Sequence, residues 1–430
     1  MSWNYRLISL KGIALVGLVI SALAPPCALS AASPPRDELA LPELIQEALE
    51  KNPEIQAARN QWEASAKRID QARALDDPTL QVQLWNFPES FNVTQTGNAI
   101  FGLSQKLPYP GKLALKGEVA SRSADIGEQA LRGKERTVIA RLKQAYYDLF
   151  LAHKAIQIHH EQVTLLRQFV EIATAKFKAG KGSQADVLKA QVELSALHQH
   201  LPVLKQRLET AGAALNILLD RDPRASLGIP KDLREAQFTK TIDELHELAV
   251  AGRPELKASE LAVQQRERAH ALAEREFYPD FNVAFQRFQN YQAPDGFGAV
   301  FSMNLPFAFW SKTKYDARVQ EATAAMAAAQ ADLHTIKNIT RYQIKDLVAK
   351  VRAAEQVALL YSTTVLPQAE QSLVATQAGY RTGKVGFLDL IETERALRGF
   401  QLEYYKALVE RQHRLAELEQ VVGTNLEPHG

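Results

Sequence analysis

Ten histidines and one glycine-lysine turn are the residues of this 430-residue chain that most invite a chemical role. The tightest histidine groups are His159-His160 and the pair of His198 and His200. Residues one or two apart on a helix do not face the same way, so neither group alone presents two ring nitrogens to a metal ion. Exposed helix positions are the better interpretation. The segment 180–183 reads Gly-Lys-Gly-Ser, but it lacks the earlier glycine that a phosphate-binding loop requires.

Catalytic and metal-binding motifs are absent from the sequence, which contains no HExxH, GxSxG or CxxC. With three methionines and one cysteine, the chain also has few soft ligands for copper(I). Lys and Arg number 51 against 49 for Asp and Glu, a balance that does not favour nucleic acid as a partner. The sequence therefore predicts that the protein is not an enzyme and has neither a cofactor nor a resident metal.

The N-terminus has the basic, apolar and small-residue order of a secretory signal peptide. Arg6 and Lys11 precede an apolar run over 12–23, and small residues follow. We expect residues 1–32 to be removed on export. After residue 32, no apolar run approaches the ~20 residues that a membrane-spanning helix needs.

The only cysteine, Cys27, has the alternative interpretation of a lipid-attachment site. Pro25 and Pro26 precede it, where a lipidation motif places a small residue other than proline. Lipidation of Cys27 is therefore not expected, and the mature chain would contain no thiol.

The two halves of the chain have matching residues at a nearly constant spacing. The pairs 201 positions apart are Leu44 and Leu245, Ala48 and Ala249, Pro53 and Pro254, and Pro78 and Pro279. Leu107-Pro108 recurs 198 positions later as Leu305-Pro306. Phe177, Gly180, Lys181 and Asp186 recur 203 positions later as Tyr380, Gly383, Lys384 and Asp389. We infer an internal duplication with a first repeat over 40–223 and a second over 241–423.

Each repeat should contain two very long helices. Residues 111–178 lack proline, and apolar residues recur at spacings of three and four, as on a helix. A helix of that length would measure about 100 Å. The second repeat shows the same pattern over 312–377, interrupted by Pro367, which should kink or split the helix.

Shorter helices should accompany the long ones. The return helices are expected over 184–219 and 388–422, and smaller helices over 54–75 and 255–276. The summed length of one return helix and one smaller helix is close to that of a long helix. Two shorter helices stacked end to end would therefore match one long neighbour.

Four strands are expected, over 79–87, 98–107, 281–289 and 297–305. Each has the nine or ten residues that a tilted strand needs to cross a bilayer. Their side chains alternate between apolar and polar, as in the wall of a transmembrane barrel. The residues expected to face lipid are Phe281, Val283, Phe285, Phe297 and Phe301. The alternative is a pair of amphipathic hairpins that cover a soluble core.

Four strands cannot close a barrel alone. Lipid offers no water to unpaired backbone groups, so an open four-stranded sheet cannot span a bilayer. If these strands are embedded in a membrane, several copies of the chain must share one barrel. Two copies would give eight strands and three would give twelve, and the sequence does not choose between them.

These features together resemble the TolC-like outer-membrane efflux proteins, over residues 40–423. The segments 177–180 and 186–188 are similar to the first helix-to-helix turn of that family, and 380–383 and 389–391 to the second. The segment 107–112, Leu-Pro-Tyr-Pro-Gly-Lys, is similar to one in the CzcC-like heavy-metal branch.

The resemblance implies a mainly α fold with a β-barrel portion. In such a homotrimer, four transmembrane strands per protomer form one twelve-stranded barrel in the outer membrane, and a long α-barrel projects into the periplasm. The implied function is a passive exit duct, supplied by an inner-membrane RND-type pump through a periplasmic adaptor protein. Heavy-metal cations are one candidate substrate. Two alternatives remain: a duct for protein secretion, and a soluble periplasmic coiled-coil scaffold.

The resemblance also implies functional residues at the periplasmic tip. The turns that would dock the adaptor or pump contain Gly180, Lys181, Gly182, Ser183, Gly383, Lys384, Val385 and Gly386. Asp389 and Glu392, with Asp186, correspond to acidic residues of the pore gate, where three copies of the first two would supply six carboxylates that attract cations. The alternative is ordinary helix N-terminal chemistry, since acidic side chains complement the helix dipole.

One departure concerns the closed state of the pore. The best-known member of the family has an arginine at the position of Val385 and a threonine at that of Ala185. The same latch hydrogen bonds cannot form here, so the sequence leaves open how the duct stays shut.

Overall fold

The computed structural model describes residues 38–85, 89, 97–233, 237–290 and 294–426. The predicted signal peptide over 1–32, which includes Cys27, lies outside the described residues. So do the last two residues of the strand predicted over 79–87.

The two halves of the chain have the same order of elements. The first half contains α1 (Leu41–Lys51), α2 (Pro53–Arg73), β2 (Thr79–Trp85), β3 (Asn98–Leu107), α3 (Lys112–Lys178) and α4 (Gln184–Leu218). The second contains α5 (Ile242–Gly252), α6 (Pro254–Arg275), β5 (Phe281–Asn290), β6 (Gly296–Met303), α7 (Lys312–Leu360), a π-helical turn (Tyr361–Val365), α8 (Leu366–Thr382) and α9 (Phe387–Val422). A short parallel pair, β1 (Glu38–Leu39) and β4 (Ile229–Pro230), joins the segment just before α1 to the link between the halves.

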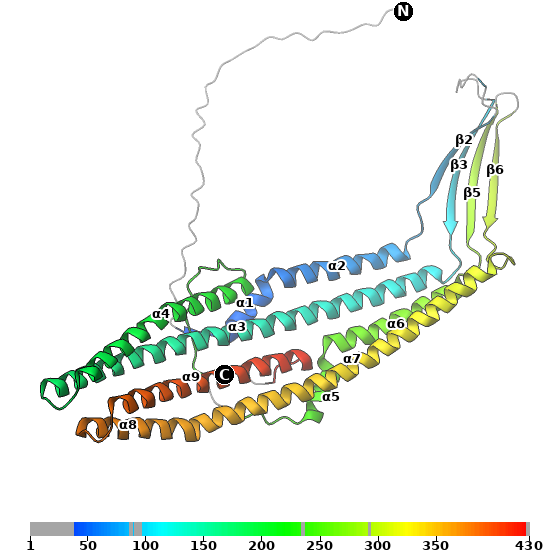
Figure 1. Cartoon of the computed structure of the whole chain (residues 1–430). Coiled ribbons are helices and arrows are strands. Elements are labelled where there is room, and N and C mark those ends of the chain that lie inside the picture. Colours follow the sequence, from blue (N-terminus) through cyan, green and yellow to red (C-terminus); the bar gives the residue numbers. More distant parts are fainter. Residues whose placement is uncertain (1–37, 86–88, 90–96, 234–236, 291–293, 427–430) are drawn as a thin grey trace, which may run out of the picture.

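The molecule is elongated, with the four long strands at one end and the turns of the helical hairpins at the other (Figure 1). α3 has 67 residues and is therefore about 100 Å long. α2 and α4 follow each other along α3, and α6 and α9 do so along α7. This is the end-to-end stacking that the helix lengths predicted.

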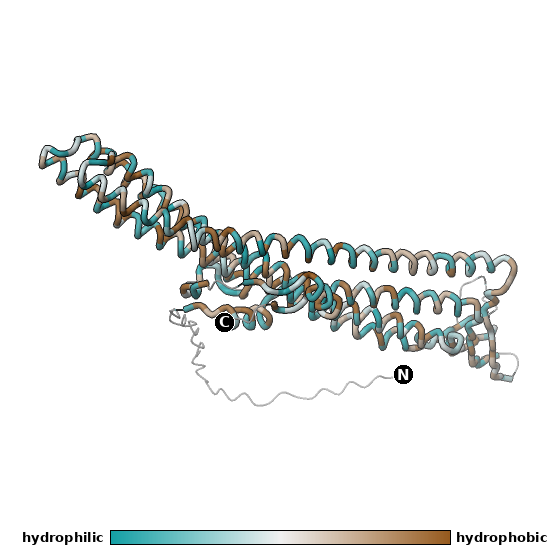
Figure 2. The backbone as a smooth tube through the Cα atoms, turned by 90° about the horizontal axis from the view of Figure 1, so that it is seen from below, coloured by the Kyte–Doolittle hydropathy of each residue, from teal (hydrophilic) through white to brown (hydrophobic). Residues whose placement is uncertain are grey.

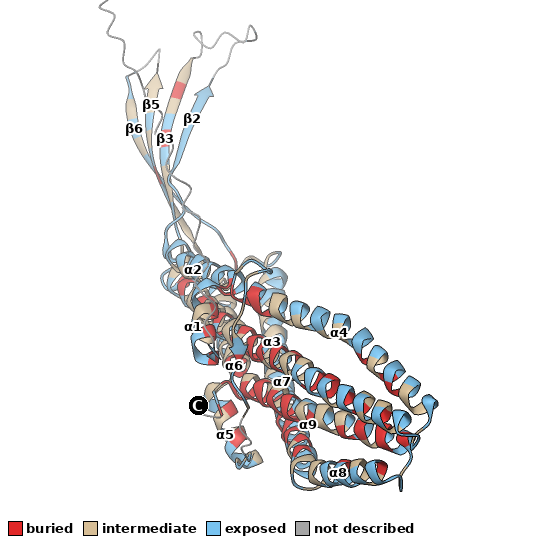
Figure 3. Cartoon of the chain, turned by 90° about the vertical axis from the view of Figure 1, so that its left-hand side faces the viewer, coloured by how far each residue is buried: buried red, intermediate tan, exposed pale blue. Residues whose placement is uncertain are grey.

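Amphipathic stripes hold the helices together. Hydrophilic and hydrophobic segments alternate along the helices in Figure 2. On α3, the buried residues Val138, Leu142, Ala145 and Leu149 recur every three or four positions. Buried residues gather along α3, α7 and α9, whereas the strands are mostly exposed or half-buried (Figure 3). The helices thus supply the core of the protomer.

The start of α2 shows how local chemistry sets a helix boundary. Asn52 accepts hydrogen bonds from the backbone N–H groups of Glu54 (2.9 Å) and Ile55 (3.3 Å), and Pro53 occupies the first helical position. Both features are favoured at helix N-termini. The Asn52 amide also donates to the carbonyl of Leu218 at the end of α4, 2.9 Å away. One buried side chain therefore fixes both the start of α2 and its junction with α4.

The predicted interruption at Pro367 is confirmed. The α-helical ladder changes to a π-helical turn over Tyr361–Val365, and α8 begins at Leu366 with Pro367 in its first turn. Proline has no N–H group and its ring clashes with the carbonyl four residues earlier, so the turn before it cannot remain a regular α-helix. α3 has no such break.

The strands form one antiparallel sheet in the order β2-β3-β5-β6. The two halves meet at its centre, where Leu107 on β3 pairs with Phe281 on β5. The strand predicted over 281–289 extends one residue further, to Asn290. The strand predicted over 297–305 is wrong at both ends and runs from Gly296 to Met303. At the next position of the register, the Asn304 N–H still donates to the Asp280 carbonyl, but the Asp280 N–H donates to the Asn304 side chain instead of the Asn304 carbonyl, so the ladder ends there.

The register gathers apolar side chains on one face of the sheet. Val283 pairs with Phe301, and Leu103 pairs with Phe285. The same face carries Leu80, Val82 and Leu84 on β2, Phe101 on β3, Phe281 on β5, and Phe297 and Met303 on β6. The opposite face is mainly polar or small, with residues such as Gln81, Gln83, Ser104, Gln286 and Gly298.

Candidate functional site

The turns at the far end of the two helical hairpins have the same backbone geometry. Gly180 and Gly383 adopt positive φ angles of 70° and 77°. After each glycine a backbone N–H reaches back to close the helix: Lys181 donates to Lys176, and Lys384 to Gly379, both at 2.9 Å. Residues with a side chain rarely adopt this conformation, so glycine is strongly favoured at both positions. The two tips are copies of one turn.

The helices that leave the two turns begin with different caps. The Ser183 hydroxyl accepts from the Asp186 N–H at 3.1 Å and caps α4. α9 follows Gly386, which has no side chain to act as a cap, and instead the Asp389 carboxylate accepts from the Gly386 N–H at 3.1 Å. Asp389 therefore has a structural role in its own turn, in agreement with the helix N-terminal interpretation.

The three acidic residues predicted for the pore gate all lie at the tips. Asp389 and Glu392 are exposed on α9, while Phe387, Leu390 and Ile391 pack inward. Asp186 is half-buried on α4. Within the described part of the protomer, no hydrogen bond joins these three side chains. In one copy of the chain, these three carboxylates lie at the tips but do not form a single site.

Lys176 on α3 and Tyr380 on α8 join the two tips, a contact that sequence reasoning missed. The Lys176 ammonium lies 4.2 Å from the centroid of the Tyr380 ring and donates to the Tyr380 carbonyl. Tyr380 is buried and packs edge-on against Phe387, with ring centroids 5.4 Å apart. Burial, with a smaller contribution from Asp186, raises the pKa of Tyr380 to about 12, so the ring stays neutral. The repeat pattern gave the position of Tyr380 but not its partner.

A second contact joins the hairpins further from the tips. The Arg395 guanidinium on α9 binds the Glu193 carboxylate on α4 through two hydrogen bonds, one of them 2.9 Å between Nε and Oε1. Glu193 is buried, and its hydrogen bond with Arg395 lowers its pKa. A buried carboxylate such as that of Glu193 requires a partner, so its pairing with the exposed Arg395 holds α4 and α9 in one register here.

Glu394, beside Arg395 on α9, is a carboxyl group with no such partner. Its side chain is 0% exposed, and neither of its oxygens has a hydrogen-bond partner among the described residues. Burial raises its pKa, an effect that Arg398 opposes and Glu193 reinforces. An ionised carboxylate without a partner is very costly in such a place, so burial favours the protonated, neutral form of Glu394.

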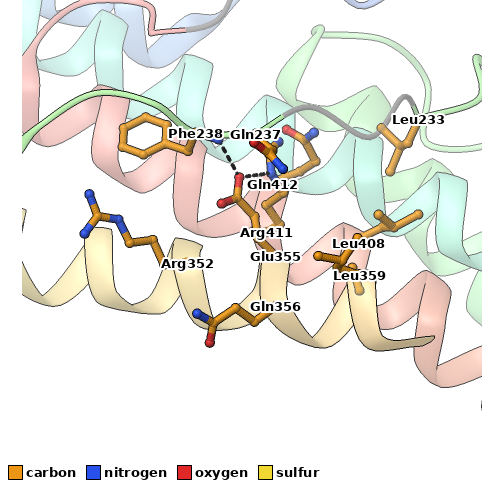
Figure 4. Close-up of a pocket in the computed structure, with 11 residues that line it drawn as sticks. Leu233, Gln237, Phe238, Arg352, Glu355, Gln356, Leu359, Leu408, Arg411 and Gln412 are labelled. Carbon is orange, nitrogen blue, oxygen red and sulfur yellow. Dashed lines mark hydrogen bonds and ion pairs between the residues drawn. The ribbon is translucent and has the colours of Figure 1, made fainter. Parts of the chain in front are cut away.

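The segment between α4 and α5, which links the two halves, is bonded to the second repeat where α7 packs against α9. The Glu355 carboxylate accepts from the backbone N–H of Phe238 at 2.8 Å and from Arg411 Nε at 2.9 Å (Figure 4). The pocket around this contact is lined by side chains of α7, α9 and the link, among them Leu359 and Leu408. The contact fixes the path of the chain beside the second repeat.

The residues predicted to face lipid come together on the sheet. Phe281 stacks with Phe301 and Phe285 with Phe297, each with ring centroids 5.7 Å apart. Phe281 is half-buried, and the other three rings, with Val283, are exposed. At the end of the sheet remote from the helices, Arg287 pairs with Asp295 at 3.3 Å, which marks a polar border.

The histidines do not form a metal centre in the described part of the chain, where no group of three or more His, Cys, Asp or Glu side chains could hold an ion. His160, His198 and His200 are exposed, as expected. The expectation was wrong for His159, which is 4% exposed between packed helices. Burial, with the nearby histidines and Arg398, lowers the pKa of His159.

Comparisons with known proteins agree with this architecture. Residues 44–220 and 245–424 match the model of the outer membrane efflux protein family. The cobalt-zinc-cadmium resistance protein CzcC of Cupriavidus metallidurans is 22% identical over 373 residues, which cover 86% of each chain. The alkaline protease secretion protein AprF of Pseudomonas aeruginosa is 25% identical over 398 residues, covering 84% of this chain and 79% of AprF. The open-state structure of the outer-membrane channel MtrE of Neisseria gonorrhoeae superposes with a TM-score of 0.74 at 18% identity, covering 90% of this chain and 89% of MtrE.

The fold is thus that of an outer-membrane channel, with a helical barrel and a β portion. Because the family model matches most of the sequence, the chain belongs to the outer membrane efflux protein family. Family membership confirms three predictions: a location in the outer membrane with a large periplasmic portion, a role in efflux, and the absence of enzymatic activity. None of the helices described is long and apolar enough to cross a membrane.

Proposed function

We propose that three copies of this chain form one efflux duct with a shared barrel of twelve strands. The observation that carries this proposal is the open sheet: among the described strands, β2 and β6 each pair on one side only. Unpaired edges are not tolerated in lipid, so the edges must meet those of other copies. Two copies would give eight strands, a barrel filled by its own side chains, whereas twelve strands leave room for water.

Disulfide trapping tests this assembly, because the mature chain is expected to contain no cysteine. Gln81→Cys on β2 is combined in turn with Gly298→Cys, Val300→Cys or Ser302→Cys on β6, all on the polar face. At least one pair should give dimers and trimers on a denaturing gel. Gln56→Cys, exposed on α2, replaces Gln81→Cys in the control. Native mass spectrometry of a monomer, with no crosslinked pair, would reject the shared barrel.

The apolar face of the sheet is proposed to meet lipid through Phe281, Val283, Phe285, Phe297 and Phe301. Four of these residues are exposed in the protomer, and together they form a continuous surface. An arginine substitution on such a surface costs about 2–4 kcal/mol at the bilayer midplane. Phe285→Arg should therefore abolish assembly in the outer membrane, whereas Gln286→Arg on the opposite face should be tolerated.

The tips are proposed to dock a periplasmic adaptor protein and an inner-membrane RND-type pump. The docking surface would comprise the turns with Gly180, Lys181, Gly182 and Ser183 and with Gly383, Lys384, Val385 and Gly386. Their similar backbone geometry supports this role, since six equivalent turns in a trimer would form a regular ring for a partner. Lys181→Glu with Lys384→Glu should abolish efflux without loss of the trimer, and normal co-purification of the adaptor with this variant would reject the proposal.

Heavy-metal cations are the proposed cargo. Similarity to a cobalt-zinc-cadmium resistance protein and exposed Asp389 and Glu392 at the tip both support it. In a trimer these residues and Asp186 would surround the pore entrance and attract cations. A deletion strain should become sensitive to divalent metals and recover when the gene is returned.

Protein secretion is the second candidate, because AprF, a protease secretion protein, is also similar. Both functions use the same architecture but a different partner. Loss of a secreted protein from the culture medium of the deletion strain, with unchanged metal tolerance, would favour secretion.

A further inference from the structure

Near the tips, the first turns of α9 bury a carboxyl group at a position where a helix normally buries an apolar side chain. The buried residues here are spaced three and four apart, as on one helix face: Phe387, Leu390, Ile391, Glu394 and Leu397. Glu394 therefore lies in the middle of this face, with apolar residues one turn before it and one turn after it. An ionisable group is thus built into the packing surface of the helix.

The two helices that pack with this part of α9 also bury polar residues. On α3, His159 and Gln162 precede Leu166 and Phe169 at the same helical spacing, and all four are buried. On α4, Glu193 is buried in the same way. We call the interface of α3, α4 and α9 near the tips the polar seam, and its polar members are His159, Gln162, Glu193 and Glu394.

Hydrogen bonds satisfy only part of the polar seam. Arg395 binds Glu193, and Gln162 Nε2 lies 3.5 Å from Gln401 Oε1 on α9. Gln162 Oε1 and both carboxyl oxygens of Glu394 have no hydrogen-bond partner among the described residues. Buried polar groups without a partner oppose packing, because they would regain hydrogen bonds to water if the helices separated. The seam therefore holds the helices together less firmly than an apolar interface would.

The groups around Glu394 make its charge depend on this packing. Burial raises the pKa of Glu394. Arg398 and Arg395 on its own helix oppose the rise, and Glu193 on α4 reinforces it. α3 and α8 contribute apolar residues to the surrounding cluster, together with Tyr380, whose ring stays neutral. Glu394 therefore releases its proton more readily when α9 leaves the seam.

His159 responds to packing in the opposite direction. Burial lowers the pKa of His159, and so do the basic groups nearby: His160 on α3, His198 and His200 on α4, and Arg398 on α9. His159 therefore takes up a proton more readily when the helices separate. One seam thus contains an acid and a base, and packing favours the neutral form of both.

We propose that Glu394 and His159 act as opposed proton switches in the polar seam and together limit the effect of pH on opening of the tips. This proposal rests on the proposed function, in which the tips surround the pore entrance. A rising pH favours separation of the helices through ionised Glu394, and a falling pH favours it through charged His159. Between pH 4.5 and 6.5, the ordinary pKa values of the two groups, the two effects oppose each other.

Single substitutions separate the two effects. Glu394→Gln leaves only His159, so the ratio of open to closed channels in single-channel recordings should fall as the pH rises from 4.5 to 6.5. His159→Gln leaves only Glu394, and the ratio should rise over the same range. One proton changes such a ratio by up to about tenfold per pH unit, and we expect about threefold or more across the range. His159→Phe, which also cannot take up a proton, is the second variant if the glutamine variant does not assemble.

The double variant, Glu394→Gln with His159→Gln, is the matched control. It keeps the carboxylates of Asp186, Asp389 and Glu392 at the tips, which titrate in every variant, so its pH response is the background. Relative to this background, the two single variants should have slopes of opposite sign. Slopes of the same sign, or no difference from the double variant, would overturn the proposal.

Thiol labelling tests the polar seam without relying on the pore. Ala190→Cys on α4 is buried beside the seam and should react only when the helices separate. Leu188→Cys, exposed on the same helix, gives the intrinsic rate at each pH. The ratio of the two rates should show the same opposite slopes in Glu394→Gln and His159→Gln. If it does and no channel can be recorded, the proposed function fails while the seam stands. If the ratio in both variants follows the double variant, the seam proposal fails even where channels are recorded.

Discussion

The Lys176 ammonium on α3 lies over the ring of Tyr380 on α8 and donates to the Tyr380 carbonyl, which joins the tip of the first repeat to that of the second. A cation over a partly desolvated aromatic ring contributes about 1–2 kcal/mol. The contact lies one turn from Gly383, where the chain reverses. It therefore connects the two hairpins close to their exposed acidic residues.

Lys176→Met should loosen the tips with little effect on the rest of the fold. The substitution keeps an unbranched side chain but removes the cation and the donor. We expect a larger open fraction in single-channel recordings on planar bilayers, and a free energy of unfolding lowered by about 1–2 kcal/mol. Lys178→Met, in the same last turn but exposed, is the matched control and should behave as the parent. Identical gating of both variants would show that the contact does not hold the tips together.

Glu394→Gln should stabilise the protein in a way that depends on pH. Burial raises the pKa of Glu394 in the folded state above its ordinary value of 4.5. Below that value both states are protonated and the group has no effect on stability. As the pH rises above it, the unfolded state releases its proton first, so the stability of the parent falls until the raised pKa is passed.

Thermal unfolding from acidic to neutral pH measures this difference. The variant and the parent should unfold at the same temperature near pH 4, with the variant increasingly more stable toward pH 7. Glu392→Gln, exposed two residues away, should follow the parent at every pH. A constant difference between Glu394→Gln and the parent would mean that Glu394 does not hold a raised pKa.

Alanine at Gly383 should destabilise the tip turn, because a side chain at a positive φ costs about 1–2 kcal/mol. The equivalent Gly180→Ala should have the same effect, since the two turns share one geometry. Gly399→Ala is the control: it is exposed within α9, and apart from its chain neighbours and the nearby backbone of its own helix, nothing lies within 4 Å of the added methyl group. It should stabilise the helix by up to about 1 kcal/mol. Chemical denaturation of purified protein would compare the three, and equal stabilities would contradict the turn geometry.

The exposed carboxylates at the tip should set the ion selectivity of the pore. Asp389→Asn with Glu392→Gln removes two charges per protomer, while the asparagine can still accept from the Gly386 N–H and preserve the cap. We expect the reversal potential in a salt gradient to shift toward anions, with unchanged thermal stability. Glu403→Gln, also exposed on α9 but further from the tip, should leave selectivity unchanged. A reversal potential equal to that of the parent would confine Asp389 and Glu392 to helix capping.

Much of this fold was predictable because its signals are local. A stretch without proline and with a helical period predicted α3 to within one residue, and alternating side chains located the four strands. The end of β6 was predicted wrongly because it depends on Asn304 bonding to Asp280, which lies 24 positions away. The predicted turn residues do lie in the two tip turns. Their contacts with the other hairpin could not be predicted, since a helical period shows which face is buried but not which helix covers it.

His159, Lys176 and Glu394 illustrate this limit. Each is a polar residue in a helix with an ordinary pattern, and nothing beside it in the sequence marks it. The burial of His159 and Glu394 depends on how α3, α4, α8 and α9 pack, as does the contact of Lys176 with Tyr380. Residues from both repeats are involved, so the duplication that helped to locate the elements did not help to pair their side chains.

The π-helical turn before Pro367 has a consequence for the history of the chain. The offset between matching residues rises from 198 at the end of the sheet to 203 at the tips, so the second copy has gained five residues in this stretch. The π-helical turn, five residues long, lies within it. A π turn closes hydrogen bonds over five residues instead of four, so it accommodates about one extra residue in a helix and accounts for only part of this gain. A duplicated gene could in this way lengthen one copy while both hairpins continued to end at the same level.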